Sequence, residues 1–157
     1  PFRSLVHGGI MHGGQLIGGD KEKRLAASSY FGPTSGFGRL FSALPDGPRR
    51  VGIIGLGAGS ITAHARAGDV FRFYEINPQV VDLAYREFTF LTESPAKTEV
   101  ILGDGRLSLE RETPQQYDVI AVVSTAAVGA TAGRARCRDR RNSTRSHRSF
   151  SRPFGRT

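Results

Sequence analysis

The chain is poor in cysteine, with Cys137 alone among 157 residues. A single thiol excludes a disulfide framework and a cysteine-based metal site within one chain. No apolar stretch approaches the roughly 20 residues of a membrane-spanning helix. The first residues, Pro1-Phe2-Arg3, contain neither an initiator methionine nor a signal-peptide pattern. We therefore expect a cytoplasmic protein without a membrane span, whose chain begins inside a larger protein.

Acidic residues are scarce at the C-terminal end. Residues 123–157 hold nine arginines and one acid, Asp139, whereas residues 1–122 hold 13 Lys/Arg and 13 Asp/Glu. The net charge of +8 therefore belongs to the tail alone. Its arginine and serine content, with almost no core-forming side chains, predicts disorder. Such a tail could bind nucleic acid without sequence preference, but the balanced charge of the remaining chain predicts no specific nucleic-acid partner.

The N-terminal region contains paired glycines. Short apolar pieces on either side of Gly8-Gly9 predict a β-hairpin, and Gly13-Gly14 predicts a second turn. His7 and His12 lie five residues apart, and no third metal ligand is evident. We interpret the two histidines as polar residues of turns and strand edges, and we expect no metal site.

Apolar runs and helical patterns alternate in the rest of the chain. Apolar residues at 37, 40, 41 and 44 follow helical spacing, and Ser35 is a suitable N-cap for that helix. The later runs predict four strands joined by helices, an order that produces a parallel sheet with right-handed crossovers. The predicted strands cover 51–56, 70–76, 99–102 and 117–122, and the predicted helices cover 36–44, 60–67, a stretch that begins at Asn77-Pro78, and 107–112.

A glycine cluster follows the first predicted strand of this sheet. Gly55-x-Gly57-x-Gly59 leads from an apolar strand into a helix start, which builds a turn that a nucleotide-like ligand can approach closely. A dinucleotide fingerprint would need glycine or alanine at Ser60. The pattern therefore favours a site of the S-adenosylmethionine type.

Two acidic residues lie at the ends of predicted strands, where they could accept hydrogen bonds from such a ligand. Glu75 ends the second predicted strand, 20 residues after Gly55, and Asp104 follows the third. Because the carboxyl ends of parallel strands share one edge of the sheet, Glu75 could accept hydrogen bonds from both ribose hydroxyls and Asp104 from an adenine amino group. We divide the chain into a hairpin and helix region (1–48), a Rossmann-like nucleotide-binding core (49–122) and the basic tail (123–157).

Together these motifs resemble the spermidine synthase family, in particular bacterial spermidine synthase-like proteins that are often fused to a membrane portion. The resemblance covers about residues 3–122. It implies the Rossmann-like fold of S-adenosylmethionine-dependent methyltransferases, with a parallel sheet, a small hairpin region before it and an incomplete C-terminus. The matching segments are Leu5–Gln15, Tyr30–Gly38, Val51–Gly59, Tyr74–Pro78, Gly103–Glu110 and Tyr117–Ile120.

The resemblance implies an aminopropyltransferase with decarboxylated S-adenosylmethionine as donor, the polyamine putrescine as acceptor and no metal; a homodimer is compatible with it. Gln15 matches a hairpin glutamine that touches the donor, and Tyr30 lies near the position of an acceptor-binding tyrosine. The remaining implied contacts are Gly55, Gly57 and Gly59 along the amino-acid-like side of the donor, Glu75 on the ribose, and Asp104 with Gly105 on the adenine.

One residue of the family pattern is missing. The family places an aspartate, which holds and deprotonates the acceptor amine, directly after the fourth strand, but this chain continues Val122-Val123-Ser124-Thr125. No catalytic residue is therefore assigned from the sequence. A shift of the reading frame near Val122 would account for the missing aspartate and the basic tail together, because Ser-Thr codons read one base earlier can encode Val-Asp.

Two alternatives stand beside aminopropyl transfer. A methyltransferase that uses S-adenosylmethionine would need the same glycine turn and the same two acids, but its site must accept the carboxylate of the donor. Non-enzymatic binding of nucleic acid through the tail would need none of these residues. An open edge of the fourth strand would also expose backbone donors and apolar side chains, which predicts aggregation.

Overall fold

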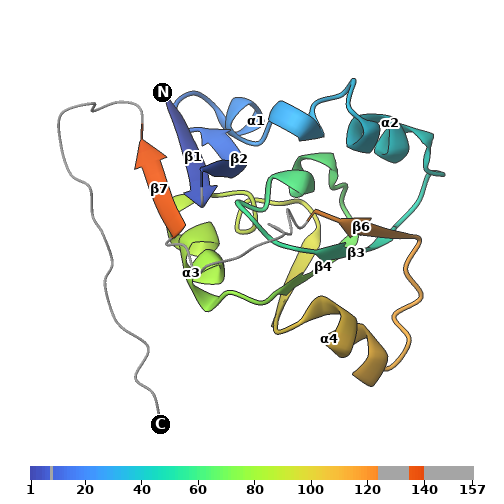
Figure 1. Ribbon diagram of the computed structural model, residues 1–157. Helices are drawn as coiled ribbons and strands as arrows, with labels where there is room; N and C mark the ends of the chain where they lie inside the picture. Colours follow the sequence, from blue (N-terminus) through green and yellow to red (C-terminus); the bar gives the residue numbers. More distant parts are fainter. Residues whose placement is uncertain (8, 124–134, 140–157) are drawn as a thin grey trace, which may run out of the picture.

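The computed structural model describes residues 1–7, 9–123 and 135–139, which form two β-sheets and the helices around them (Figure 1). The strands are β1 Phe2–His7, β2 Ile10–Leu16, β3 Arg50–Ile54, β4 Val70–Glu75, β5 Lys97–Leu102, β6 Val119–Val122 and β7 Ala135–Asp139. The helices are α1 Lys21–Arg24, α2 Gly36–Ala43, α3 Pro78–Glu87 and α4 Gly105–Arg111, with single 3-10 turns at η1 Ser29–Phe31 and η2 Ser60–His64.

The larger sheet is parallel throughout and has the order β5-β4-β3-β6. The chain moves outward from β3 through β4 to β5, and it then crosses to β6 on the other side of β3. The four strands predicted from the apolar runs are confirmed, with slightly different ends. The strand order therefore reverses between β3 and β6, and a crevice can open at such a reversal, at the carboxyl edge of the sheet.

One face of the parallel sheet carries the main core. Val51 and Ile53 of β3 lie beside Phe71 and Phe73 of β4, and all four side chains are fully buried. The ring of Phe41 on α2 stacks on Phe71 with 5.9 Å between the ring centroids. Burial of each such side chain contributes roughly 1.5–3 kcal/mol relative to exposure. Figure 1 shows α2 on this side of the sheet and α4 on the opposite side.

Side-chain caps start the two longest helices, and the cap at Ser35 was predicted from the sequence. The Ser35 Oγ accepts a hydrogen bond of 3.1 Å from the backbone N–H of Gly38 in α2. The Asn77 Oδ1 accepts one of 2.9 Å from the backbone N–H of Gln79 in α3. Each cap satisfies a backbone donor that the helix itself leaves unpaired. Both starts therefore follow from local chemistry.

The helix predicted over 60–67 is wrong, because the structure has only the 3-10 turn η2 there. The backbone N–H of Ala65 donates to the carbonyl oxygen of Thr62 at 2.9 Å, which is three-residue rather than four-residue closure. The guanidinium of Arg49 donates to the carbonyl oxygen of His64 at 2.9 Å. The His64 carbonyl oxygen is therefore bonded to Arg49, a residue outside the turn. The backbone becomes extended at Ala65, where ψ is 144°.

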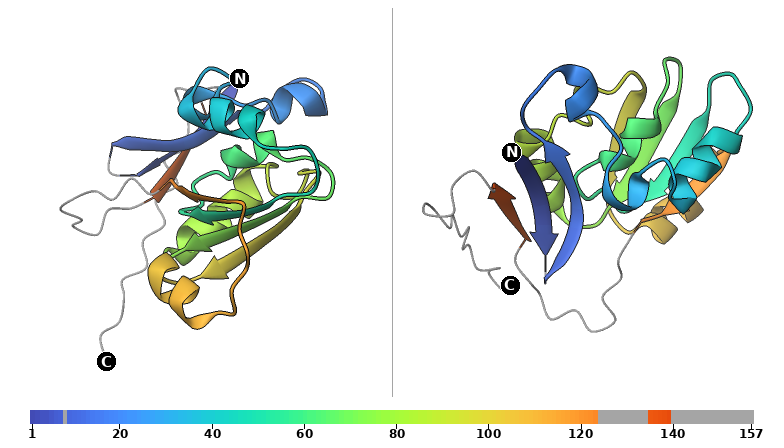
Figure 2. Two further views of the ribbon diagram at one scale, coloured as in Figure 1. Left: turned by 90° about the vertical axis from the view of Figure 1, so that its right-hand side faces the viewer. Right: turned by 90° about the horizontal axis from the view of Figure 1, so that it is seen from above.

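The hairpin predicted around Gly8-Gly9 is confirmed as the antiparallel pair of β1 and β2, in which His7 lies opposite Ile10. The second turn predicted at Gly13-Gly14 is wrong, since both residues lie within β2. The register of the pairing between β1 and β2 shifts between Ser4 and Val6. This shift is a β-bulge, and β2 continues through it as one strand. Figure 2 shows the hairpin sheet beside the parallel sheet.

A third strand, β7, pairs antiparallel with the other edge of β1, so the small sheet has the order β2-β1-β7. This strand falls within the tail for which composition predicts disorder. Its sequence, Ala-Arg-Cys-Arg-Asp, alternates small and charged residues, and the unpaired backbone of β1 offers it hydrogen bonds. The remaining tail residues, 124–134 and 140–157, lie outside the described part of the chain.

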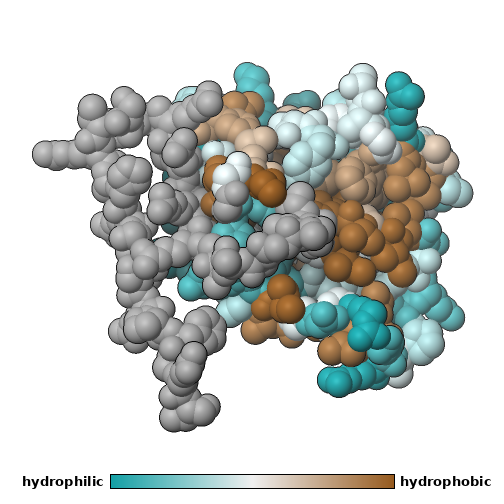
Figure 3. Space-filling view, in the orientation of Figure 1, coloured by the Kyte–Doolittle hydropathy of each residue, from teal (hydrophilic) through white to brown (hydrophobic). Residues whose placement is uncertain are grey.

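Among the described strands, β6 ends the parallel sheet on one side. Ile120 and Val122 of this strand are 52% and 65% exposed, and Leu40 of α2 is 39% exposed. Figure 3 shows a hydrophobic patch over β6 and α2. The exposed edge and its apolar side chains are the features from which we predicted aggregation, and the aggregation itself stays a prediction.

A buried ion pair joins the starts of β3 and β4. Arg49 and Asp69 directly precede the two strands, and their side chains are 4% and 0% exposed. The carboxylate of Asp69 accepts hydrogen bonds of 2.9 Å from the backbone N–H of Arg49 and of Arg66. Burial alone would raise the pKa of the Asp69 carboxyl, but these bonds and the Arg49 guanidinium outweigh burial and lower that pKa.

We expect Asp69→Asn to lower the free energy of unfolding by about 3–5 kcal/mol, because it leaves the buried guanidinium without its counter-charge. Asp46→Asn is the matched control, since Asp46 is fully exposed and pairs with Arg66 at 3.4 Å. Urea denaturation of both variants at neutral pH provides the measurement. Because the native carboxyl has a lowered pKa, its contribution is complete above the usual carboxyl range and disappears as the pH falls through the native pKa. Equal stability of the two variants would contradict this account.

Candidate ligand-binding site

A cavity of about 380 Å³ opens at the carboxyl ends of the parallel strands, next to the hairpin. Its volume lies within the range of roughly 300–1,000 Å³ that is common for small-molecule sites. The lining consists of Leu5, His7 and His12 from the hairpin, Tyr30 from η1, residues 54–57 from the end of β3 onward, residues 74–77 from the end of β4 onward, Val80 of α3, residues 103–105 after β5, and Val123 after β6.

The glycine turn after β3 forms one wall of this cavity. The backbone N–H of Gly55 donates to the carbonyl oxygen of Tyr74 at 2.8 Å, which ties the turn to the end of β4. At Gly57, where φ is 54°, a side chain would overlap the carbonyl oxygen of His12. The next backbone N–H, of Ala58, donates to that same oxygen at 3.3 Å. The turn therefore holds the hairpin against the parallel sheet.

Glu75 ends β4 with its carboxylate held by two backbone donors. One oxygen, Oε2, accepts from the N–H of Leu56 at 2.9 Å, and the other, Oε1, accepts from the N–H of Asn77 at 2.9 Å. The side chain is 8% exposed and lines the cavity. A carboxylate has about four acceptor positions, so each oxygen can accept a further hydrogen bond from a ligand hydroxyl.

Asp104 and Gly105 lie at the end of β5, where the sequence predicted a second acidic contact. The Oδ1 of Asp104 accepts a hydrogen bond of 2.9 Å from the backbone N–H of Leu107, so this side chain caps α4. Gly105 packs closely against Ile54 and Tyr74 of the sheet. Both residues line the cavity together with the glycine turn and Glu75. The structure therefore brings the three predicted strand ends to one place.

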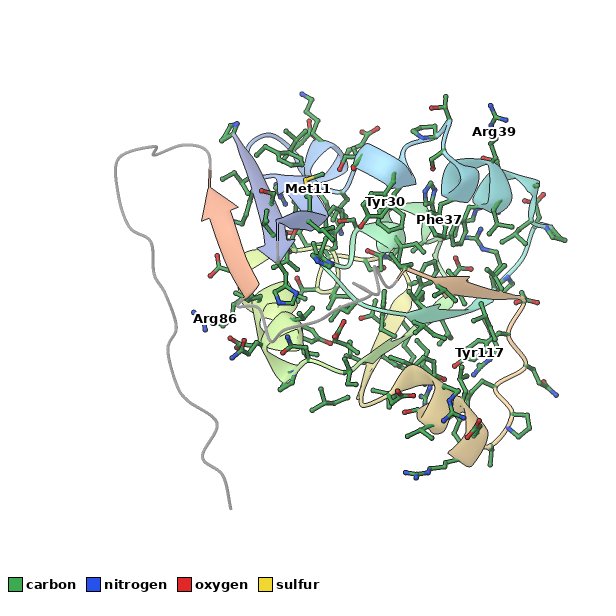
Figure 4. The ribbon with its side chains drawn as sticks, in the orientation of Figure 1. Met11, Tyr30, Phe37, Arg39, Arg86 and Tyr117 are labelled. Atoms are coloured by element: carbon green, nitrogen blue, oxygen red, sulfur yellow. The ribbon has the colours of Figure 1, made fainter. Side chains whose placement is uncertain are left out.

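Tyr30 reaches the cavity from η1. Its side chain is 38% exposed, and burial raises the pKa of its phenol. Tyr30 also lies beside Phe37 of α2, at a shallow apolar groove next to the cavity (Figure 4). A protonated phenol with an apolar ring suits contact with an organic ligand.

Two predicted site residues do not line the cavity. The amide of Gln15 is 2% exposed, and its Nε2 donates to Thr89 Oγ1 at 2.8 Å while its Oε1 accepts from the Thr89 N–H at 3.0 Å. Gln15 therefore joins β2 to the segment after α3. Gly59 instead packs against Phe90 and Leu91. Gly59 lies at the end of the turn that faces Phe90 and Leu91, and for this reason it does not line the cavity.

Two histidines, interpreted from the sequence as turn and strand-edge residues, line the cavity instead. The rings of His7 and His12 lie with 5.8 Å between their centroids. Leu5, which is buried at the same site, lies two residues before His7 on the same face of β1. That two-residue period is a local signal that could have assigned His7, but not His12, to the cavity.

Burial lowers the pKa of His12, and the positive charge that His7 can carry lowers it further. A hydrogen bond to the backbone of His7 and the charge of Glu75 act in the opposite direction without cancelling these effects. Since an unperturbed imidazole titrates near pH 6.5, His12 is neutral at physiological pH.

The charged side chains that line the cavity are acidic. Glu75 and Asp104 contribute carboxylates, and no lysine or arginine is among the described lining residues. A cavity with this charge favours a cationic ligand over an anionic one. The site can therefore hold a ligand with hydroxyl and amino donors and a positive charge.

No group of three or more His, Cys, Asp or Glu side chains in the described residues could hold a metal ion. In the same part of the chain, every helix is too short or too polar to cross a membrane. A scan against protein-family models and a search of curated proteins give no match for this chain. The functional argument therefore starts from the geometry of the cavity.

We expect Gly57→Ala to destabilise the protein more than Gly68→Ala. Both glycines have positive φ, 54° and 90°, so both substitutions carry the left-handed backbone cost of roughly 1–2 kcal/mol. Only the alanine at position 57 also overlaps the carbonyl oxygen of His12 and displaces the hairpin. Urea denaturation measures the difference, and equal losses would show that the turn does not hold the hairpin.

Proposed function

We propose that this chain is an aminopropyltransferase of the spermidine synthase type, with decarboxylated S-adenosylmethionine as donor, putrescine as acceptor and a cytoplasmic location. The observation that carries the proposal is the convergence of the glycine turn, Glu75 and Asp104 on one cavity. They come from the ends of β3, β4 and β5, which are neighbours in the sheet. The sequence motifs that resemble this family include the same three positions.

The order of the parallel strands supports a Rossmann-like fold of the methyltransferase kind. In doubly wound sheets the strands run outward from the first strand and then resume on its other side, and ligands bind at this reversal. The order β5-β4-β3-β6 has its reversal between β3 and β6. Val123, directly after β6, lines the cavity together with residues that follow β3. The cavity thus lies where such folds bind ligands.

In this proposal, three segments of the chain would contact three parts of the donor. Glu75 would accept hydrogen bonds from the two ribose hydroxyls, because the backbone N–H groups of Leu56 and Asn77 hold its oxygens in place. Asp104 with Gly105 would contact the adenine, whose amino group is a donor. The backbone at Gly55 and Gly57 would lie along the amino-acid-like side of the donor.

The charge of the lining favours aminopropyl transfer over methyl transfer. S-adenosylmethionine carries a carboxylate that its decarboxylated form lacks. The described lining offers no lysine or arginine to that carboxylate and holds Glu75 and Asp104 instead. At an effective dielectric constant of about 20, two like unit charges about 8 Å apart repel by roughly 2 kcal/mol. Such repulsion weakens binding of the carboxylated donor by more than tenfold.

Aminopropyl transfer needs a group that takes a proton from the acceptor. The amine attacks the carbon beside the sulfonium only when its nitrogen has a free electron pair, so an ammonium must first be deprotonated. Between Asp118 and Asp139 the sequence contains no acidic residue. An aspartate directly after β6, as the family has it, is therefore not part of this chain, and the proton acceptor must come from another element.

Calorimetric titration with the two donors tests the proposed function. We expect decarboxylated S-adenosylmethionine to bind at least tenfold more tightly than S-adenosylmethionine, because the acidic lining repels the carboxylate. The reverse preference would favour the methyltransferase. Absence of binding by either donor would overturn the proposal as a whole.

The role of Glu75 can be tested with the same titration. We expect Glu75→Gln to weaken the donor by roughly 10–100-fold, since hydrogen bonds to a charged group contribute about 1.5–3 kcal/mol. Asp82→Asn is the matched control, because the Asp82 side chain is exposed on α3, in an ion pair of 2.9 Å with Arg86. Unchanged donor affinity in a folded Glu75→Gln protein would remove Glu75 from the site.

A further inference from the structure

We propose that the apolar groove over α2 binds the hydrocarbon part of the acceptor amine. The inference rests on the proposed function, and it extends the class of acceptors from putrescine to primary amines with a longer apolar chain. The groove has a volume of about 400 Å³ and lies next to the cavity. Tyr30 lines both spaces, so they are continuous at its side chain. An acceptor with its nitrogen in the cavity can therefore extend across Tyr30 into the groove.

The groove offers apolar contacts and no charge. Its lining consists of Tyr30 from η1, Ser35 at the N-cap of α2, and Gly36, Phe37 and Leu40 from α2 (Figure 4). None of these described lining residues is charged. The Ser35 Oγ already accepts the hydrogen bond from the backbone N–H of Gly38. A hydrocarbon chain therefore suits the groove better than a polar group, which would lose hydrogen bonds to water and gain few in return.

Packed aromatic rings support the groove. The ring of Phe31, which is buried, contacts those of Tyr30 and Phe37, with 4.5 Å and 5.2 Å between the ring centroids. The Nε2 of His64 on η2 lies 2.8 Å from the carbonyl oxygen of Phe31. The His64 ring in turn stacks on Phe41 of α2 at 4.9 Å. These contacts join η1 to α2, so the groove exists before a ligand binds, and binding loses little conformational entropy.

The backbone directly before Tyr30 is strained. Ser29 has a φ of 56°, in the left-handed region that is unfavourable for residues with a side chain. The backbone N–H of Phe31 donates to the carbonyl oxygen of Ser28 at 3.1 Å, which closes the turn around this strained residue. Such conformations persist where the surrounding structure holds them, and they are common at ligand sites. The strained turn places Tyr30 where the cavity and the groove meet.

The cavity and the groove match the two ends of such an amine. Glu75 and Asp104 place two carboxylates in the lining of the cavity, which attract the positively charged nitrogen. The apolar end of the molecule then lies in the uncharged groove. Putrescine has a second ammonium, which the groove cannot neutralise, so putrescine would stay within the cavity. An amine with one charged end and a long apolar chain would use both spaces.

Calorimetric titration with n-alkylamines tests the groove in the unmodified protein. The protein is first saturated with 5′-methylthioadenosine, which fills the donor site, and is then titrated with n-butylamine and with n-octylamine. We expect n-octylamine to bind at least about tenfold more tightly, because each methylene buried in the groove raises the affinity by roughly two- to fourfold. Equal affinities of the two amines would overturn the proposal.

The same titration with Leu40→Gln tests where the chain lies. Leu40 is 39% exposed, so a glutamine of similar length is compatible with the fold and makes the groove more polar. We expect the affinity for n-octylamine to fall by about five- to tenfold, and that for n-butylamine to stay unchanged. Leu16→Gln is the matched control, since Leu16 is 43% exposed on β2 and lines neither space. Equal effects of the two substitutions on n-octylamine would contradict the assignment.

A second copy of the chain is the other occupant that these variants distinguish. Leu40 lies on α2, over which Figure 3 shows a hydrophobic patch that extends to β6. The continuity of the groove with the cavity at Tyr30 favours the amine. Sedimentation of wild type and Leu40→Gln should therefore give the same oligomeric state. A changed oligomeric state with an unchanged affinity for n-octylamine would make the groove a contact between copies and overturn the proposal.

The two levels of proposal fail in different ways. Absence of donor binding by the wild type would overturn the proposed function itself. Donor binding together with an amine affinity that does not depend on chain length would leave the donor site standing and remove only the inference about the groove. Calorimetry of the donor with Leu40→Gln should give the wild-type affinity, because the groove serves the acceptor alone.

Discussion

The carbonyl oxygen of His12 lies against the glycine turn, and this backbone contact joins the two sheets. The turn offers the N–H of Ala58 at 3.3 Å, and the absence of a side chain at Gly57 leaves the carbonyl room to approach. The side chain of His12 lines the cavity that the contact closes. The glycine turn therefore has two effects. It offers a bare backbone to a ligand, and it fixes the opposite wall at a set distance.

Two buried carboxylates show how the same group serves stability in one place and binding in another. Asp69 is paired with the guanidinium of Arg49, so its charge is neutralised inside the protein. Glu75 is held by the backbone N–H groups of Leu56 and Asn77, and no lysine or arginine lines the cavity beside it in the described residues. Its charge therefore remains for a ligand. Asp69 thus faces a counter-charge, whereas Glu75 faces the cavity.

Local chemistry explains what the sequence could predict. The apolar runs, the caps at Ser35 and Asn77 and the glycine turn each depend on neighbouring residues, and all appear in the structure. The end of η2 depends on a guanidinium from Arg49, and the burial of Gln15 depends on Thr89. Such partners lie far away in the sequence and leave no local pattern. His12 belongs to the same class, because only the contact with the turn brings its strand to the cavity.

The small sheet lines one side of the cavity and also holds the strand β1 in place. β1 lies between β2 and β7, so the strand that carries His7 is paired along both edges. A strand paired along both edges has its backbone N–H and C=O groups satisfied, so Leu5 and His7 keep their place in the lining of the cavity. Every contact proposed for the donor lies between Gly55 and Gly105, in the part of the chain that the structure describes.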